Sequence, residues 1–120
     1  MADYVDGYVF PVSRDRLEAY QRLASTIAEL WIEHGATAYR EYVGPDQEIE
    51  GTLPFAPLLG CTDDEVVVFG WMCFPSREAR DAAHEALAAD PRVEALMADA
   101  DVGFDASRMV YGGFRPLVEA

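Results

Sequence analysis

The sequence holds two copies of one strand-turn-helix pattern, which read Gly7-Tyr8-Val9-Phe10-Pro11-Val12-Ser13-Arg14-Asp15 and Gly70-Trp71-Met72-Cys73-Phe74-Pro75-Ser76-Arg77-Glu78. In each copy a glycine lies inside a β-rich run, Phe-Pro follows, and a Ser-Arg-acid step opens a helix. Proline cannot donate to a strand ladder, and serine is a favoured helix N-cap. The doubled unit indicates a chain built from two similar halves, but it names no reaction.

The periodicity of apolar residues around these copies predicts four strands and two main helices. The strands are expected at residues 4–12, 36–43, 65–74 and 108–114. The first helix is expected from the Ser13 cap to about His34, and the second after Ser76. Asp90-Pro91 predicts a short additional helix to about Met97, because proline is favoured at the first helical position. Residues 99–106 form a polar connection.

The element order βαββαβ predicts one ferredoxin-like α+β domain spanning residues 1–120. Right-handed crossovers place both helices on one face of a four-stranded antiparallel sheet with the strand order 4-1-3-2. The segment 44–64 is unusually long for a connection, and it carries three prolines together with several apolar residues. It is either a lid or binding loop, or a short helical turn that covers a sheet edge; we favour the second interpretation.

Composition excludes several classes of partner. The formal net charge is −13, and all nine cationic side chains are arginines, so nucleic acid and anionic membranes are not expected as partners. This acidity favours solubility, or alternatively the steering of a cationic ligand. No apolar run is long enough to span a membrane, and the N-terminus lacks a basic secretory signal, so a cytoplasmic location is expected.

The alternation within the strands separates two sheet faces. In the first strand Val5, Gly7 and Val9 share one face, and the other face carries Tyr4, Asp6, Tyr8 and Phe10. Aligning Gly7 with Gly70 puts Val66, Val68 and Met72 with the glycines, and Phe69, Trp71 and Cys73 with the aromatic side chains. Because glycine permits close approach, we expect the helices on the glycine face. The aromatic face then needs cover, which predicts a homodimer with a cavity between the paired sheets.

Several segments resemble the YbaA-like proteins, a small bacterial family of unknown function. The resemblance rests on Tyr4-Val5-Asp6-Gly7-Tyr8-Val9, Trp31-Ile32-Glu33-His34-Gly35-Ala36, Glu65-Val66-Val67-Val68-Phe69-Gly70-Trp71, Arg80-Asp81, Asp90-Pro91-Arg92 and, most specifically, Arg108-Met109-Val110-Tyr111-Gly112-Gly113-Phe114. The family in turn resembles the dimeric α/β-barrel superfamily, whose members pair ferredoxin-like sheets. That superfamily includes cofactor-free monooxygenases, isomerases, haem enzymes and proteins without known chemistry. The resemblance carries over no catalytic residues.

Asp6 and His34 are the candidate catalytic residues. Burial of Asp6 in the middle of a strand would make it a general acid or base, although an inward charge paired with an arginine across the dimer is the simpler interpretation. Arg40 and Arg108 are its candidate counter-ions. His34 could transfer a proton, or it could complement the dipole at the end of the first helix. We expect His84 to be exposed on the second helix.

Five further residues are candidates for contact with a ligand: Tyr8, Glu41, Trp71, Arg108 and Tyr111. Glu41 should share the face of Asp6, on the order of 10 Å away across the intervening strand. Arg108 could bind a carboxylate in a ligand. The aromatic residues at strand or helix spacing are more commonly core.

No metal or cofactor is expected. The two histidines lack ligand spacing, the cysteines Cys61 and Cys73 fit no zinc pattern, and Gly112-Gly113 lacks the context of a phosphate loop. Three functions remain open. The first is a homodimer that binds a small, partly apolar molecule; the second is a cofactor-independent monooxygenase or isomerase; the third is a purely structural dimer with a filled interior. The sequence does not decide whether the protein is an enzyme.

Overall fold

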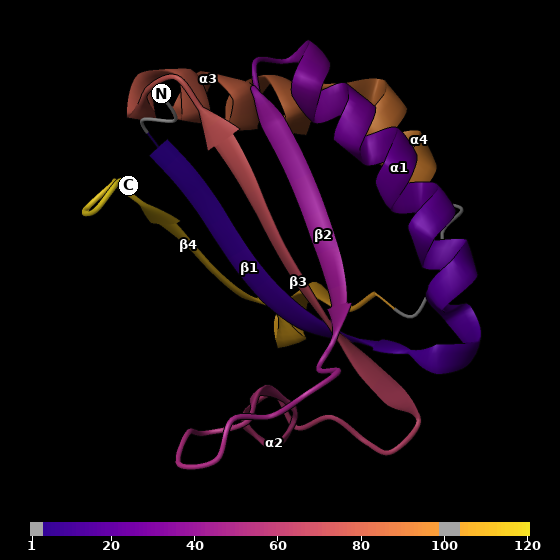
Figure 1. Ribbon diagram of the computed structural model, residues 1–120. Helices are drawn as coiled ribbons and strands as arrows, with labels where there is room; N and C mark the ends of the chain where they lie inside the picture. Colours follow the sequence, from indigo (N-terminus) through magenta and orange to yellow (C-terminus); the bar gives the residue numbers. More distant parts are fainter. Residues whose placement is uncertain (1–3, 99–103) are drawn as a thin grey trace.

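The computed structural model describes residues 4–98 and 104–120. A four-stranded antiparallel sheet has one face covered by helices, which are labelled α1, α3 and α4 in Figure 1. The main elements in chain order are β1 (Tyr4–Ser13), α1 (Leu17–Glu33), β2 (Ala38–Gly44), α2 (Phe55–Leu58), β3 (Glu65–Phe74), α3 (Arg77–Ala88), α4 (Pro91–Ala98) and β4 (Val110–Phe114). This is the ferredoxin-like α+β architecture that the sequence predicts.

The strand order β2-β3-β1-β4 confirms the predicted order, with the two copies of the repeated motif at the centre. These copies pair antiparallel, so that Tyr8 lies opposite Gly70 and Gly7 lies opposite Trp71. Directly paired residues share a face. The side of the sheet under the helices therefore carries Tyr8 together with Gly70, and the other side carries Gly7 together with Trp71.

The predicted assignment of faces is right for β3 and wrong for β1. Asp6, Tyr8 and Phe10 are buried beneath the protein's own helices and do not form the uncovered face. Alignment of Gly7 with Gly70 in sequence ignored the antiparallel pairing, which offsets the two copies by one residue, and a one-residue offset exchanges the faces. Gly70 is required by Tyr8 and not by a helix, because a Cβ at position 70 would collide with the Tyr8 ring.

The hydrophobic core fills the space between the sheet and the helices. Its buried members come from β1, β3 and the helices: Tyr8, Phe10, Val12, Tyr20, Trp31, Ala36, Val68, Met72, Phe74 and Ala83. Phe10 meets both Tyr20 and Phe104 edge-to-face, with ring centroids 5.4 and 5.1 Å apart. These aromatic pairs attach α1 and the segment before β4 to the central strand.

The helices begin differently in the two copies. Ser76 is the predicted N-cap, since its Oγ accepts a hydrogen bond from the backbone N–H of Ala79 at 3.0 Å. Ser13 makes no such bond; its hydroxyl donates to Asp15, a 3₁₀ turn (Arg14–Arg16) follows, and α1 starts only at Leu17. Asp90 accepts from the backbone N–H of Arg92, as expected for the cap of α4. Residues 99–103 of the predicted polar connection lie outside the described residues.

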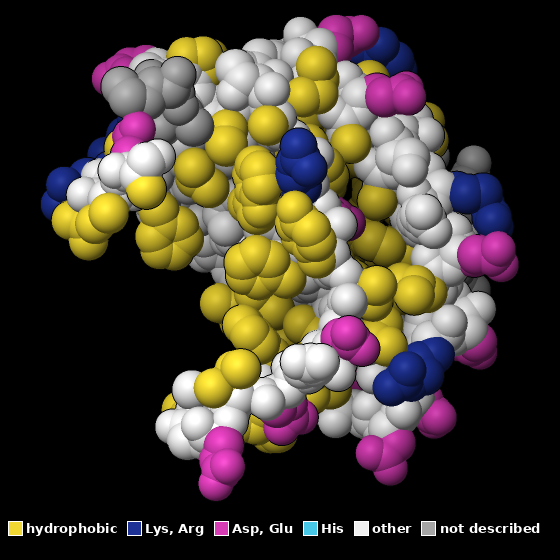
Figure 2. All heavy atoms as spheres, viewed as in Figure 1, with side chains coloured by type: hydrophobic (Ala, Val, Ile, Leu, Met, Phe, Trp, Pro, Cys, Tyr) yellow, Lys and Arg dark blue, Asp and Glu magenta, His cyan; other side chains and the backbone are white. Residues whose placement is uncertain are grey.

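The helices α1, α3 and α4 leave the opposite face of the sheet uncovered (Figure 1). We call it the bare face; its most exposed large apolar side chains are Tyr42, Phe69, Val110 and Phe114. Figure 2 shows hydrophobic side chains gathered on the hollowed side of the molecule, between the C-terminal segment and the loop that contains α2. Within that loop Phe55 meets Phe69 edge-to-face at 6.3 Å, so the helical turn α2 packs on β3. Among the described residues, none of the helices has the length and hydrophobicity that a membrane crossing needs.

Candidate functional site

Two cavities lie on the covered side of the sheet. The first has a volume of about 260 Å³ and an apolar, largely aromatic lining that includes Tyr8, Trp31, Phe104 and Tyr111. The second, of about 340 Å³, lies between α1 and β2. The sequence predicted a cavity between the sheets of two subunits; these cavities instead lie between one sheet and its own helices, because Asp6 and its neighbours face inward.

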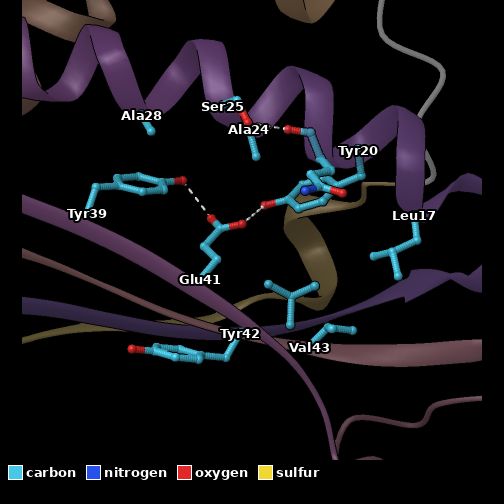
Figure 3. Close-up of a pocket in the computed structure, with 11 residues that line it drawn as sticks. Leu17, Tyr20, Ala24, Ser25, Ala28, Tyr39, Glu41, Tyr42 and Val43 are labelled. Carbon is cyan, nitrogen blue, oxygen red and sulfur yellow. Dashed lines mark hydrogen bonds between the residues drawn. The ribbon is translucent and has the colours of Figure 1, made fainter.

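Glu41 lies on the boundary between the two cavities and lines both of them. In Figure 3 its side chain rises from β2 toward α1, between Tyr39 and Tyr20. Three phenols donate to its carboxylate: Tyr20 to Oε1 at 2.6 Å, and Tyr8 and Tyr39 to Oε2 at 2.7 and 2.6 Å. None of the ion pairs found among the described residues involves Glu41. We call this group the Glu41 centre.

The phenols of the Glu41 centre stay neutral. Burial, followed by the charge of Glu41 and the hydrogen bonds around it, raises the pKa of Tyr20 well above its usual range. Burial also raises the pKa of Tyr8 and of Tyr39, and it is the largest cause in both cases. The three hydroxyls therefore act as donors to the Glu41 carboxylate.

A second carboxylate is held differently. Asp6 is fully buried and accepts hydrogen bonds from Arg80 Nε at 2.9 Å, His84 Nε2 at 2.5 Å and the Tyr111 hydroxyl at 2.5 Å. We call this group the Asp6 centre. The Tyr111 hydroxyl also lies 3.2 Å from His84 Nε2. Burial is the leading cause that raises the pKa of Tyr111, with the bond to Asp6 next.

Tyr111 links the Asp6 centre to the Glu41 centre. Its ring stacks on Tyr8 with centroids 5.6 Å apart and lines the apolar cavity. Trp31 lines the same cavity and packs against the His84 ring at 4.8 Å. A molecule in the cavity would thus lie near a phenol that bonds a buried carboxylate and an imidazole. Such an arrangement can position a hydrogen-bonding ligand or pass a proton.

The structure brings together some of the predicted site residues and separates others. Tyr8, Glu41 and Tyr111 line the apolar cavity. Trp71 lies on the bare face, paired across from Gly7, with the Arg40 guanidinium 5.9 Å above its ring. Asp6 and Glu41 share one face with β3 between them, as expected, but that face is the covered one.

Arg108 lies elsewhere. Its guanidinium binds both oxygens of Glu65, at 2.6 and 3.0 Å, and the carbonyl of Gly60 at 3.0 Å. The expectation that Arg40 or Arg108 is the counter-ion of Asp6 is wrong, because Arg80 of α3 occupies that role. Arg108 instead holds the end of the long loop against β3, and it lowers the pKa of Glu65 to about 2.

His34 belongs to a separate cluster at the end of α1. Its Nε2 lies 2.8 Å from Asp90 Oδ2, and the ligand atoms of Glu33, His34 and Asp90 lie within 4.8 Å of one another, a spacing that could hold a metal ion. The Arg92 guanidinium already binds Glu33 and Asp90. Its hydrogen bonds, together with that from His34, hold the pKa of Asp90 below its usual range. A metal would have to displace Arg92, and His34 is not a lining residue of either cavity.

Four functional side chains escaped the sequence analysis: Tyr20, Tyr39, Arg80 and His84. Of these, Arg80 and His84 carried a usable signal, because their i, i+4 spacing places both on one face of α3 beside the buried Ala83. The expectation that His84 is exposed is wrong; its side chain is partly buried against Trp31 and Asp6. The Tyr20 ring belongs to the hydrophobic core, and its hydroxyl donates to Glu41.

The comparisons with known proteins cover most of the chain. The family described as "Protein of unknown function (DUF1428)" matches residues 3–106. The "Uncharacterized protein YbaA" of Escherichia coli strain K12 is 35% identical over 116 residues, 97% of each chain, and that of Shigella flexneri matches equally.

One solved structure shares the fold. It is the crystal structure of a monooxygenase from the gene ActVA-Orf6 of Streptomyces coelicolor in complex with the ligand Nanaomycin D. It matches with a TM-score of 0.58 and 17% identity, over 99% of this chain and 91% of that one. At this identity the likeness concerns the fold alone. The family match and the relatives, by contrast, identify the chain as a member of the DUF1428 family of proteins of unknown function.

Proposed function

We propose that the protein binds a small, largely apolar molecule in the cavity between its sheet and helices. The observation that carries this proposal is a largely aromatic cavity of about 260 Å³ whose few polar side chains include phenols and the carboxylate of Glu41. Binding sites for small molecules are typically concave and apolar with a few converging polar groups. The structural neighbour, which is described in complex with Nanaomycin D, supports the idea that this fold can hold such a molecule.

Ligand binding can be tested with a library of small aromatic and alicyclic compounds in a thermal-shift assay. Ala24 lines both cavities, so Ala24→Leu should fill space that a ligand needs. We expect some compounds to raise the melting temperature of the natural protein, because a ligand stabilises the state that binds it. The shift should be lost in Ala24→Leu and retained in Ala82→Leu, an exposed substitution on α3. A library without hits, or equal shifts in both variants, would refute the proposal.

The second part of the proposal is a homodimer formed through the bare face. Phe69, Val110 and Phe114 expose 44, 62 and 60% of their surface there. Monomeric proteins seldom expose contiguous apolar patches larger than a few hundred Å². Two copies of the sheet packed face to face would cover these side chains, and the projecting loop with α2 and the C-terminal segment would flank the partner (Figure 2).

The dimer can be tested by analytical ultracentrifugation. We expect the natural chain to sediment with the mass of two chains and Val110→Glu to sediment as one chain, because a charge would be buried in the interface. Ala82→Glu adds the same charge to an exposed site on α3 and should remain dimeric. A natural chain that sediments with the mass of one chain would rule out this interface.

The Asp6 centre favours a second candidate function, a cofactor-independent monooxygenase or isomerase. Tyr111 lines the cavity and bonds both Asp6 and His84, which provides a route for a proton between a bound molecule and the buried pair. The structural neighbour is described as a monooxygenase, which supports this candidate at the level of the fold.

Turnover can be tested with hydroxyaromatic substrates, by following oxygen uptake and product formation. Tyr111→Phe keeps the ring that stacks on Tyr8 and removes the hydroxyl, so we expect binding to persist and turnover to fall at least ~100-fold, the usual size of a proton-transfer contribution. Asp6→Asn should act in the same direction. Full turnover in Tyr111→Phe would show that the proton does not pass through the phenol.

A further inference from the structure

We propose that the natural ligand of the cavity is an organic cation: an amine or quaternary ammonium group on an aromatic or aliphatic body, with the positive group bound beside Glu41. This inference rests on the proposed ligand-binding function and specifies the chemistry of its ligand. It starts from the charge of the cavity walls. Among the described residues that line the two cavities, Glu41 is the only one with a charged side chain, and it contributes to both.

No ion pair found between described residues gives Glu41 a cationic partner. Its hydrogen-bond donors are the neutral phenols of Tyr8, Tyr20 and Tyr39. By contrast, the carboxylate of Asp6 has Arg80 as a partner at 2.9 Å. Burial of a carboxylate without a cationic partner is unfavourable, and a bound cation would relieve that cost. A lone carboxylate on an apolar cavity is therefore a recognition group for a positive charge.

The carboxylate also retains capacity for another donor. Two oxygens offer about four acceptor positions, and the three phenols occupy three of them. Among the described residues, Oε2 accepts from Tyr8 and Tyr39, whereas Oε1 accepts from Tyr20 alone. The remaining position on Oε1 can accept an ammonium N–H without breaking any of the bonds in the Glu41 centre.

The aromatic walls suit a cation as well. Trp31, Phe104 and Tyr111 join the phenols of the Glu41 centre around the apolar cavity. Cations are attracted to the faces of aromatic rings, most strongly where water is excluded. The formal net charge of −13 would draw a positive ligand toward the protein and repel an anionic one. An anion in the cavity would in addition meet Glu41 at close range.

The test compares three probes with one ring and different charges: 2-phenylethylamine, 2-phenylethanol and 3-phenylpropanoate. Their dissociation constants are measured by isothermal titration calorimetry at pH 7 and low salt. We expect the amine to bind at least tenfold more tightly than the alcohol, and the carboxylate to bind most weakly. Glu41→Gln should bring the affinity for the amine down to the level of the alcohol in the same variant. Glu29→Gln, an exposed position on α1, removes the same charge and should change nothing.

Tyr39→Phe provides a second test that keeps the carboxylate. It removes one donor from Oε2 and frees an acceptor position, so the amine should bind at least as tightly as in the natural protein. A tenfold loss in this variant would contradict the inference, even if Glu41→Gln failed to fold.

The outcomes separate the two proposals. Equal affinities for amine and alcohol would overturn the cationic ligand while supporting the cavity as a binding site. A preference for the amine that survives in folded Glu41→Gln would place the cation elsewhere and would also overturn the inference. Failure of all three probes to bind, together with a library without hits, would overturn the proposed function itself.

Discussion

The two faces of the sheet are both apolar, yet the protein treats them differently. The covered face meets α1, α3 and α4 and contains the carboxylates of Asp6 and Glu41, whose hydrogen-bond donors come mostly from other elements of the chain. The bare face leaves Phe69, Val110 and Phe114 exposed by 44, 62 and 60%, although Phe55 of α2 packs against Phe69. Hydrophobicity alone therefore does not identify the face of the sheet that holds the candidate site. The covered face combines cavities with hydrogen-bonding groups, whereas the bare face offers contact area.

The strongest test of this contrast uses two phenylalanines of β3. Phe74 is fully buried on the covered face, and Phe69 remains 44% exposed on the bare face. We expect Phe74→Ala to lower the free energy of unfolding by about 3–5 kcal/mol, through lost burial and the cavity left behind. Phe69→Ala should lower it by about 1 kcal/mol in the isolated chain, because much of its ring already meets solvent. Urea denaturation at one protein concentration measures both; similar losses would contradict the assignment of faces.

The Asp6 centre provides the next test. Asp6→Ala leaves the partly buried Arg80 and His84 without their acceptor, and loss of one partner of a buried pair costs about 3 kcal/mol or more. Arg40→Ala on the bare face removes only the guanidinium above Trp71, a contact of about 0.5–1 kcal/mol. Chemical denaturation should separate the two variants clearly. An Asp6→Ala protein as stable as Arg40→Ala would show that the buried carboxylate is not held by its ion pair.

The two glycines of the repeated motif form a matched pair. A Cβ at Gly70 would collide with the Tyr8 ring, whereas a Cβ at Gly7 would lie 3.5 Å from the Phe114 ring, an ordinary contact. We expect Gly70→Ala to destabilise the protein by about 1–3 kcal/mol and to displace Tyr8 from Glu41. Gly7→Ala should change stability by less than about 1 kcal/mol. Thermal unfolding measures the stability of both variants. Equal losses of stability would mean that the Tyr8 ring can move away from a Cβ at position 70 at little cost.

The smallest expected effect concerns Glu65, which is the first residue of β3 and lies on the bare side of the sheet. Arg108 lowers the pKa of Glu65 to about 2, below the value of about 4.3 expected in the unfolded chain. Because the folded-state pKa is depressed, this carboxylate stabilises the fold above about pH 4, and its contribution is lost as the pH falls toward 2. The stability difference between the natural protein and Glu65→Gln should therefore shrink from pH 7 to pH 3. A constant difference in urea titrations would argue against the ion pair.

The sequence was sufficient for the architecture because local signals agree with the global arrangement. Proline and serine after each central strand, together with helical periodicity from Leu17 to Trp31, predict the βαββαβ order, and handedness then gives the strand order. The faces of β1 could not be assigned in this way. Both alternating sets in β1 are apolar apart from Asp6, so only the antiparallel register with β3 decides which set is buried.

The candidate site was only partly predictable for a related reason. The strand positions of Tyr8, Glu41 and Tyr111 predict contact with a ligand, and all three residues line one cavity. Their partners come from helices distant in sequence: Tyr20 from α1, and Arg80 and His84 from α3. The pairing of Asp6 with Arg80 joins residues that are 74 positions apart, and no local pattern encodes such a contact. The i, i+4 spacing of Arg80 and His84 predicts that they share a helix face, but it does not predict that this face contacts Asp6.

The two tryptophans lie on opposite sides of the sheet. Trp31 lines the apolar cavity beside His84, and Trp71 lies beneath Arg40 on the bare face. The protein thus contains an intrinsic fluorophore for each of its two proposed contacts. Emission from Trp71→Phe would report solely on molecules that enter the cavity, and emission from Trp31→Phe would report solely on the approach of a second chain, so that occupancy and assembly can be followed separately without an added dye.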